Sequence, residues 1–223
     1  MNVTNEHISA DKTMLRSAKI ISKIFTPFSI PFVAFLILFL FSYLRIMPLK
    51  YKMIVLMIVL VNTIIIPFIT IFLFRHIKSL DRINQHDRKR RYFPFLIYII
   101  SDITCLLIMR KLVIPWYMIG IILSSLIIMV VCFFTNIKWK ISEHMAGAGG
   151  IIGGLVSFST LFGYNPIGWL CIFIFVAGAL GSARITLGHH NLAEVLAGFV
   201  LGFISTILVL HPAVNQIFRV FLL

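Results

Sequence analysis

Seven long apolar segments recur along the 223-residue chain and limit the folds open to it. A helix needs about 20 consecutive apolar residues to cross the hydrocarbon core of a bilayer. We predict such helices over Phe25–Ile46, Met53–Phe74, Pro94–Met109, Pro115–Thr135, Met145–Phe162, Ile167–Ala183 and Leu192–Leu210. Hydrophobic residues make up 60% of the chain and charged residues 12%, too few to cover a soluble fold of this size. The sequence therefore predicts an all-α integral membrane protein.

The ends of the first apolar segment decide the domain organisation. Before it, Lys12, Arg16, Lys19 and Lys23 recur every three or four residues, which indicates an amphipathic segment over residues 1–24 on the membrane surface. Residues 25–223 then form a single transmembrane domain. Two prolines interrupt the start of the first segment, so that segment either crosses the bilayer or re-enters it. We expect a bundle of six to seven transmembrane helices.

Alternate crossing of the bilayer sorts the connecting segments onto two faces. The N-terminus and the connections over 75–93, 136–144 and 184–190 fall on one face, which carries every histidine except His211 and every acidic residue except Asp102. We therefore expect a site at this face. Asp102 lies inside a predicted span, where it fits either a functional role or a hydrogen bond to a neighbouring helix.

The segment Arg184-Ile-Thr-Leu-Gly-His-His190-Asn-Leu-Ala-Glu194 has the strongest chemical pattern. His190 and Glu194 are four residues apart and would share a helical face, so the carboxylate would hold one imidazole nitrogen and leave the other as a base or nucleophile. Arg184 and the start of the last helix suit a phosphate. The same residues also fit interfacial histidines beside an arginine that extends to the headgroups.

Two further connections on this face carry groups that bind phosphate. Ser142 would donate a hydrogen bond to a phosphate oxygen or cap the following helix, and His144 would protonate a leaving alkoxide. The loop over residues 82–91 contains five cations and fits either a polyanion or anionic lipid headgroups.

Taken together, these residues resemble the motifs of the type 2 phosphatidic acid phosphatase family, which shares its catalytic core with vanadium haloperoxidases. Its third motif, S-R-x5-H-x3-D, is matched by Arg184, His190 and Glu194, with Ala183 in place of serine and glutamate in place of aspartate. The second, P-S-G-H, keeps Ser142 and His144 but has isoleucine and glutamate in place of proline and glycine. The first, K-x6-R-P, is degenerate, and we assign Arg88 and Arg91 to its cations.

The resemblance implies a reaction and a role for each of these residues. His190 would attack phosphorus and form a phosphohistidine, Glu194 would orient its imidazole, and His144 would protonate the departing alkoxide. Arg184, Ser142, Arg88 and Arg91 would bind the phosphoryl oxygens. The substrate would be a lipid phosphate or diphosphate drawn from the surrounding membrane lipids, and no cofactor or metal is implied.

The location follows from the resemblance and conflicts with the charge count. The family's orientation implies an integral protein of a bacterial inner membrane with an exoplasmic (periplasmic) site. However, 14 of the 20 lysines and arginines fall on the site face, which favours a cytoplasmic one. Because part of this charge belongs to the site, we adopt the exoplasmic orientation.

Other functions stay open at this point. An anion or lipid transporter, or an inactive relative, would use the same basic vestibule. A metal-dependent hydrolase would use His144, His189, His190 and Glu194 as ligands. Nucleic acid is not expected as a partner of the chain, despite its net charge of +13, because no basic stripe accompanies a soluble module.

Overall fold

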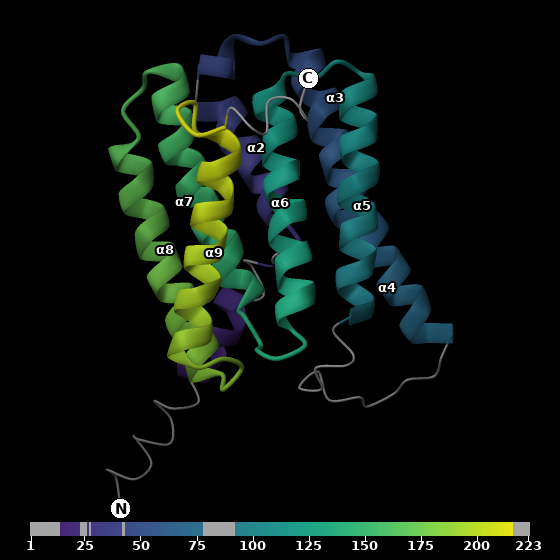
Figure 1. Ribbon diagram of the computed structural model, residues 1–223, viewed down its shortest axis with the longest axis vertical. Helices are drawn as coiled ribbons and strands as arrows, with labels where there is room; N and C mark the ends of the chain where they lie inside the picture. The colour runs from purple at the N-terminus through teal and green to yellow at the C-terminus, as the bar shows by residue number, and fades with distance from the viewer. Residues whose placement is uncertain (1–13, 23–25, 27, 42, 78–91, 216–223) are drawn as a thin grey trace, which may run out of the picture.

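The fold is a bundle of helices that stand side by side along the long axis of the molecule (Figure 1). The computed structural model describes residues 14–22, 26, 28–41, 43–77 and 92–215, and this part of the chain contains no strand. Six helices in it are long and apolar enough to cross a membrane. They are Leu49–Leu73, α5 (Tyr92–Lys111), α6 (Trp116–Thr135), α7 (Glu143–Phe162), α8 (Ile167–Thr186) and α9 (Leu192–Leu210). The predicted all-α membrane bundle is confirmed.

The first predicted span is shorter than expected. Helix α2 covers only Ile30–Phe41, a length of about 18 Å, and the 3₁₀-helix η1 (Tyr43–Ile46) follows it. Pro31 lies in the first turn of α2, where a missing N–H costs nothing, so it explains where the helix begins. The segment still passes from the end of the bundle near residues 14–22 to the opposite end, where the next helix begins (Figure 1).

The span Leu49–Leu73 contains a change of helix type. It consists of α3 (Leu49–Leu60), the π-helical turn η2 (Val61–Ile65) and the first part of α4 (Ile66–Ile77). At this turn the Ser101 hydroxyl of α5 donates a hydrogen bond to the Asn62 carbonyl. A neighbouring helix thus supplies a donor for a carbonyl group that the wider π-helical turn exposes.

Asp102 is buried in the same region, with 3% of its surface exposed. Its carboxyl group makes a hydrogen bond with Ser125 of α6. A buried polar side chain in a bilayer needs such a partner, and this contact matches the interpretation of Asp102 as a link between helices.

Helices α7 and α9 form the closest helix pair, because glycines remove side chains from their interface. A Cβ atom added to Gly202 of α9 would lie 1.7 Å from the Ala146 carbonyl oxygen of α7, and one on Gly149 would lie 2.1 Å from the Phe199 carbonyl oxygen. Only glycine allows two backbones to approach this closely in lipid. This crossing sets how the first turns of the two helices meet.

Candidate active site

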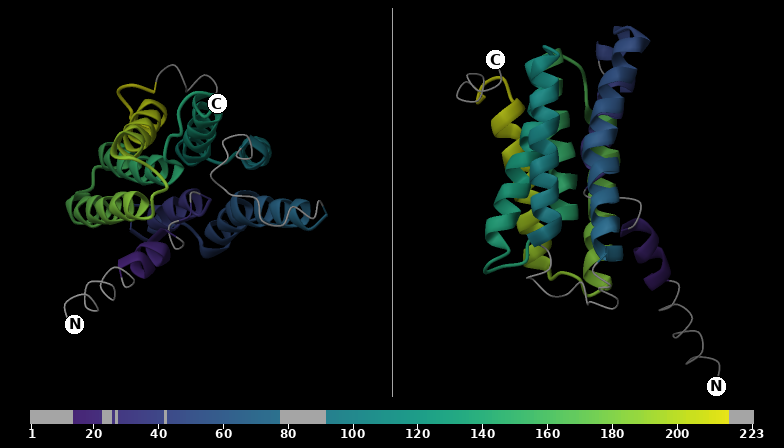
Figure 2. Two further views of the ribbon diagram at one scale, coloured as in Figure 1. Left: turned by 90° about the horizontal axis from the view of Figure 1, so that it is seen from below. Right: turned by 90° about the vertical axis from the view of Figure 1, so that its right-hand side faces the viewer.

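The predicted site residues of α7, α8 and α9 lie at one end of the bundle, which we call the site end. Helices α7 and α9 begin there and α8 ends there, and the helical residues 14–22 lie beside them (Figure 2). The connections over 136–142 and 187–191 are therefore neighbours, although they are about 50 positions apart in the chain.

His190 and Glu194 form a hydrogen-bonded pair. His190 Nδ1 lies 2.8 Å from Glu194 Oε2, and the two side chains are 1% and 13% exposed. His190 precedes α9 and does not share a helical face with Glu194, contrary to our expectation. The pair forms instead through the helix cap: Asn191 Oδ1 accepts from the Glu194 N–H at 2.8 Å, while Glu194 Oε2 accepts from the Asn191 N–H at 3.4 Å.

This cap determines which imidazole nitrogen can react. When Nδ1–H donates to the carboxylate, Nε2 carries the lone pair of the neutral ring. Because Glu194 is itself held by the cap, it fixes both the tautomer and the direction of the ring. The geometry suits a histidine nucleophile or base whose reactive atom is Nε2.

A tight turn brings Arg184 next to His190. Gly188 follows the end of α8 with φ of +66°, the left-handed conformation that glycine adopts without strain. The Arg184 carbonyl accepts from the backbone N–H groups of His189 at 3.1 Å and His190 at 3.4 Å. The turn thus joins the arginine and the histidine through the backbone, while the charge of Arg184 acts on the neighbouring His144.

Ser142 reaches the same place from α7. It precedes the helix as its N-cap residue, and its backbone N–H donates to the Glu194 carbonyl at 3.2 Å. Its side chain makes no capping hydrogen bond, and its buried Oγ has no hydrogen-bond partner within the described part of the chain. A buried hydroxyl group without a partner is uncommon in proteins, and this one is compatible with the predicted role of Ser142 in binding phosphate.

His144 completes the set in the first turn of α7. It interacts electrostatically with Arg184, His189 and His190, and it makes a hydrogen bond with the backbone of Ser22. His144 therefore lies close enough to Arg184 and His190 for their charges to interact.

Two residues of the site end were missed by sequence reasoning. The Ser22 hydroxyl accepts from Arg184 Nη1 at 2.8 Å, which ties the N-terminal helical residues 14–22 to the site. Lys140 Nζ donates to the His189 carbonyl at 3.0 Å and joins the two connections. Ser22 gives no local signal because its partner lies 162 positions away, whereas Lys140 is marked by its place two residues before Ser142.

The cations assigned to the first motif, Arg88 and Arg91, lie outside the described residues. Within the described ranges, no three His, Cys, Asp or Glu side chains gather closely enough to hold a metal ion. His144, His189, His190 and Glu194 therefore do not form a ready ligand set for the metal-dependent hydrolase considered above.

The chain matches no protein-family model, no curated protein and no solved structure. The resemblance to lipid phosphatases thus depends on the motif residues alone, and the geometry at the site end has to be judged by its own chemistry.

The helix cap allows the role of Glu194 to be tested separately from folding. Glutamine also completes a capping box, so Glu194→Gln keeps the start of α9 but loses the charge that orients and polarises His190. If the protein carries out the lipid-phosphate hydrolysis that the resemblance implies, we expect kcat to fall between about a hundredfold and ten-thousandfold, with unchanged thermal stability in detergent. An unchanged rate would remove Glu194 from the mechanism.

Proposed function

We propose that the protein is a metal-independent membrane phosphatase that hydrolyses a lipid phosphate or diphosphate. The observation that carries the proposal is the His190–Glu194 pair, with Nδ1 and Oε2 2.8 Å apart, next to Arg184, Ser142 and His144. These groups supply a nucleophile, an orienting carboxylate, an acid and donors for phosphoryl oxygens.

The reaction proceeds in two steps. His190 Nε2 attacks phosphorus in line with the leaving oxygen, so the N–P bond forms as the P–O bond breaks. His144 binds a proton together with the anionic substrate and gives it to the departing alkoxide or phosphate. A water molecule then attacks the phosphohistidine, His144 takes the water proton, and phosphate leaves with His190 regenerated.

Fixed positive groups stabilise the charge that develops on the phosphoryl oxygens. Arg184 donates from its guanidinium and Ser142 from its hydroxyl, and both are held in place by the backbone of the α8–α9 turn and the α7 cap. The basic loop over residues 82–91 adds Arg88 and Arg91 to the same anion in this proposal. In this position the phosphate stays at the membrane face while its lipid chains remain in the bilayer, and we place this face on the exoplasmic side.

The decisive experiment measures phosphate release from phosphatidic acid and a panel of lipid phosphates and diphosphates by the detergent-solubilised protein, with and without EDTA. We expect turnover that survives chelation, because the proposed groups, Arg184 and Ser142, stabilise the charge without a metal ion. Loss of activity on chelation would contradict the metal-independent reaction, and inactivity on the whole panel would contradict the phosphatase function.

A further inference from the structure

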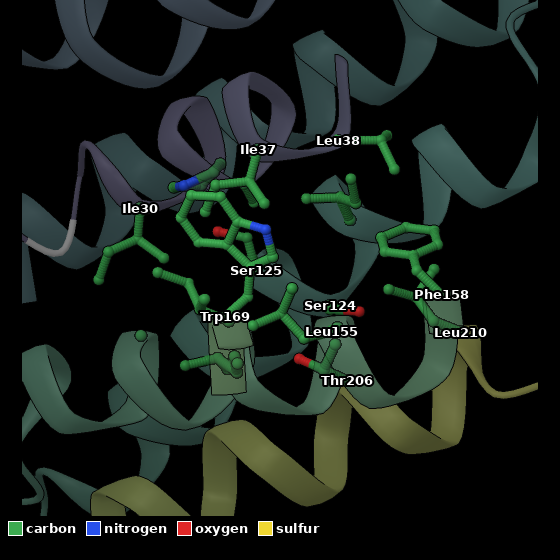
Figure 3. A pocket seen from close by; sticks show the side chains of 18 of the residues that line it. Ile30, Ile37, Leu38, Ser124, Ser125, Leu155, Phe158, Trp169, Thr206 and Leu210 are labelled. Atoms are coloured by element: carbon green, nitrogen blue, oxygen red, sulfur yellow. The ribbon is translucent and has the colours of Figure 1, made fainter. Parts of the chain in front are cut away.

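An apolar cavity lies between α2 and the helices α6, α7 and α9. It measures about 850 Å³ when the space open to the surroundings is included. Figure 3 shows Ile37 and Leu38 of α2 on one side of it and Leu155 of α7 and Leu210 of α9 on the other. Its lining is predominantly hydrocarbon, so a polar ligand would lose its hydrogen bonds to water without replacement.

The two serine hydroxyl groups in the lining are already hydrogen-bonded within the protein. Ser124 donates to the Gly120 carbonyl at 2.7 Å, and Ser125 makes the hydrogen bond with Asp102. Neither therefore requires a polar ligand. An apolar space of this size inside a bilayer would be filled by hydrocarbon, which the surrounding lipid supplies.

The cavity runs along α7 from its first turn, the turn that also carries His144. Glu143 lines it at the start of the helix, directly between Ser142 and His144 in the sequence, and Phe158 lines it farther along. From Gly147 to Phe158 the helix rises about 17 Å, close to half of the ~30 Å hydrocarbon core and hence to the length of one leaflet's chains.

The cavity is narrow near the site. A Cβ atom on Gly147 would lie 1.8 Å from Ile30 Cδ1 of α2, so the missing side chain lets Ile30 pack close against α7 here. We propose that the cavity binds one hydrocarbon chain of the phosphorylated lipid while the phosphate lies among Arg184, Ser142 and His190. The identity of the headgroup rests on the proposed function, whereas binding of the chain rests on the cavity.

Gly154 offers a way to fill the cavity without disturbing the helices. An added Cβ atom would meet only Thr206 Cγ2 at 3.8 Å, an ordinary contact, so a larger side chain extends into the cavity. Gly154→Leu is therefore compared with Gly178→Leu, the same change at an exposed position of α8 where an added Cβ meets no atom within 4 Å.

The first readout is activity on palmitoyl and hexanoyl glycerol phosphate. Gly154→Leu should lower kcat/KM for the palmitoyl substrate about tenfold and leave the hexanoyl substrate unchanged, because only the long chain reaches residue 154. Gly178→Leu should change neither value. Equal losses on both substrates, or no loss on either, would overturn the proposal.

The second readout is binding, and it does not depend on hydrolysis. Palmitoyl glycerol phosphate with a photoactivatable diazirine at the chain end should label Leu155 and Phe158 in the native protein and in Gly178→Leu, and lose this labelling in Gly154→Leu. Labelling confined to residues on the lipid-facing surface would contradict binding of the hydrocarbon chain in the cavity. Labelling of the cavity without hydrolysis of any substrate would support binding of the hydrocarbon chain but contradict the proposed phosphatase function.

Discussion

Replacement of His190 by alanine is expected to lower phosphate release at least about a thousandfold, because the proposed nucleophile is lost and no other group replaces it. The imidazole is 1% exposed, so alanine also leaves a void. His190→Asn avoids most of that effect, since its amide nitrogen can replace Nδ1 as the donor to Glu194. Both variants should be inactive, and the asparagine variant should keep the native Tm.

The neighbouring histidine provides the matched control. His189→Ala keeps the backbone carbonyl that accepts from Lys140, so the connection between the two segments is preserved. We expect it to retain most of the activity. It should also still form the phosphohistidine intermediate, detected as a burst of acid-labile, base-stable phosphate on the protein. An active His190→Asn variant, or a His189→Ala variant as inactive as His190→Ala, would contradict the assignment of the nucleophile.

Replacement of Gly202 by alanine is expected to damage both stability and activity. The added Cβ atom would lie 1.7 Å from the Ala146 carbonyl oxygen, which is backbone and cannot turn aside, so α7 and α9 must separate. Overpacking of this kind costs about 1–3 kcal/mol, which corresponds to a fall in Tm of roughly 2–12 °C in detergent. Valine should have a larger effect.

Activity should fall with stability because the same crossing holds the site together. The hydrogen bond from the Ser142 N–H to the Glu194 carbonyl joins the first turns of the two helices, one turn beyond the closest contacts. The control is Gly178→Ala on the exposed face of α8, where an added Cβ meets no atom within 4 Å. A Gly202→Ala variant with native Tm would show that the helices can separate without cost.

The helices were predictable because each is a long apolar segment with clear ends. Leu192–Leu210 was predicted with the bounds that the structure has, and α8 extends the predicted Ile167–Ala183 by three residues. The π-turn at Val61–Ile65 was not predictable, because the group that binds its exposed carbonyl, Ser101, comes from another helix. Local composition does not encode such a contact.

The candidate site was predictable only as far as its residues are neighbours in the chain. The spacing of His190 and Glu194 indicated their pairing, although the helix cap rather than a shared face brings them together. The approach of Ser142 to Glu194 depends on glycines along two helices. The contact of Arg184 with Ser22 joins residues that lie 162 positions apart in the chain. Both depend on tertiary packing, which no single motif contains.

The direction of α9 has a practical consequence. The helix begins beside His190 and carries the chain to the opposite end of the bundle (Figure 1). A reporter protein fused behind this helix would therefore occupy the compartment opposite the one that the site end faces. Fluorescence of such a fusion reports the compartment that one end of the bundle faces. Hydrolysis of a membrane-impermeant phosphate by intact cells reports whether the site end faces outward, so the two results should agree.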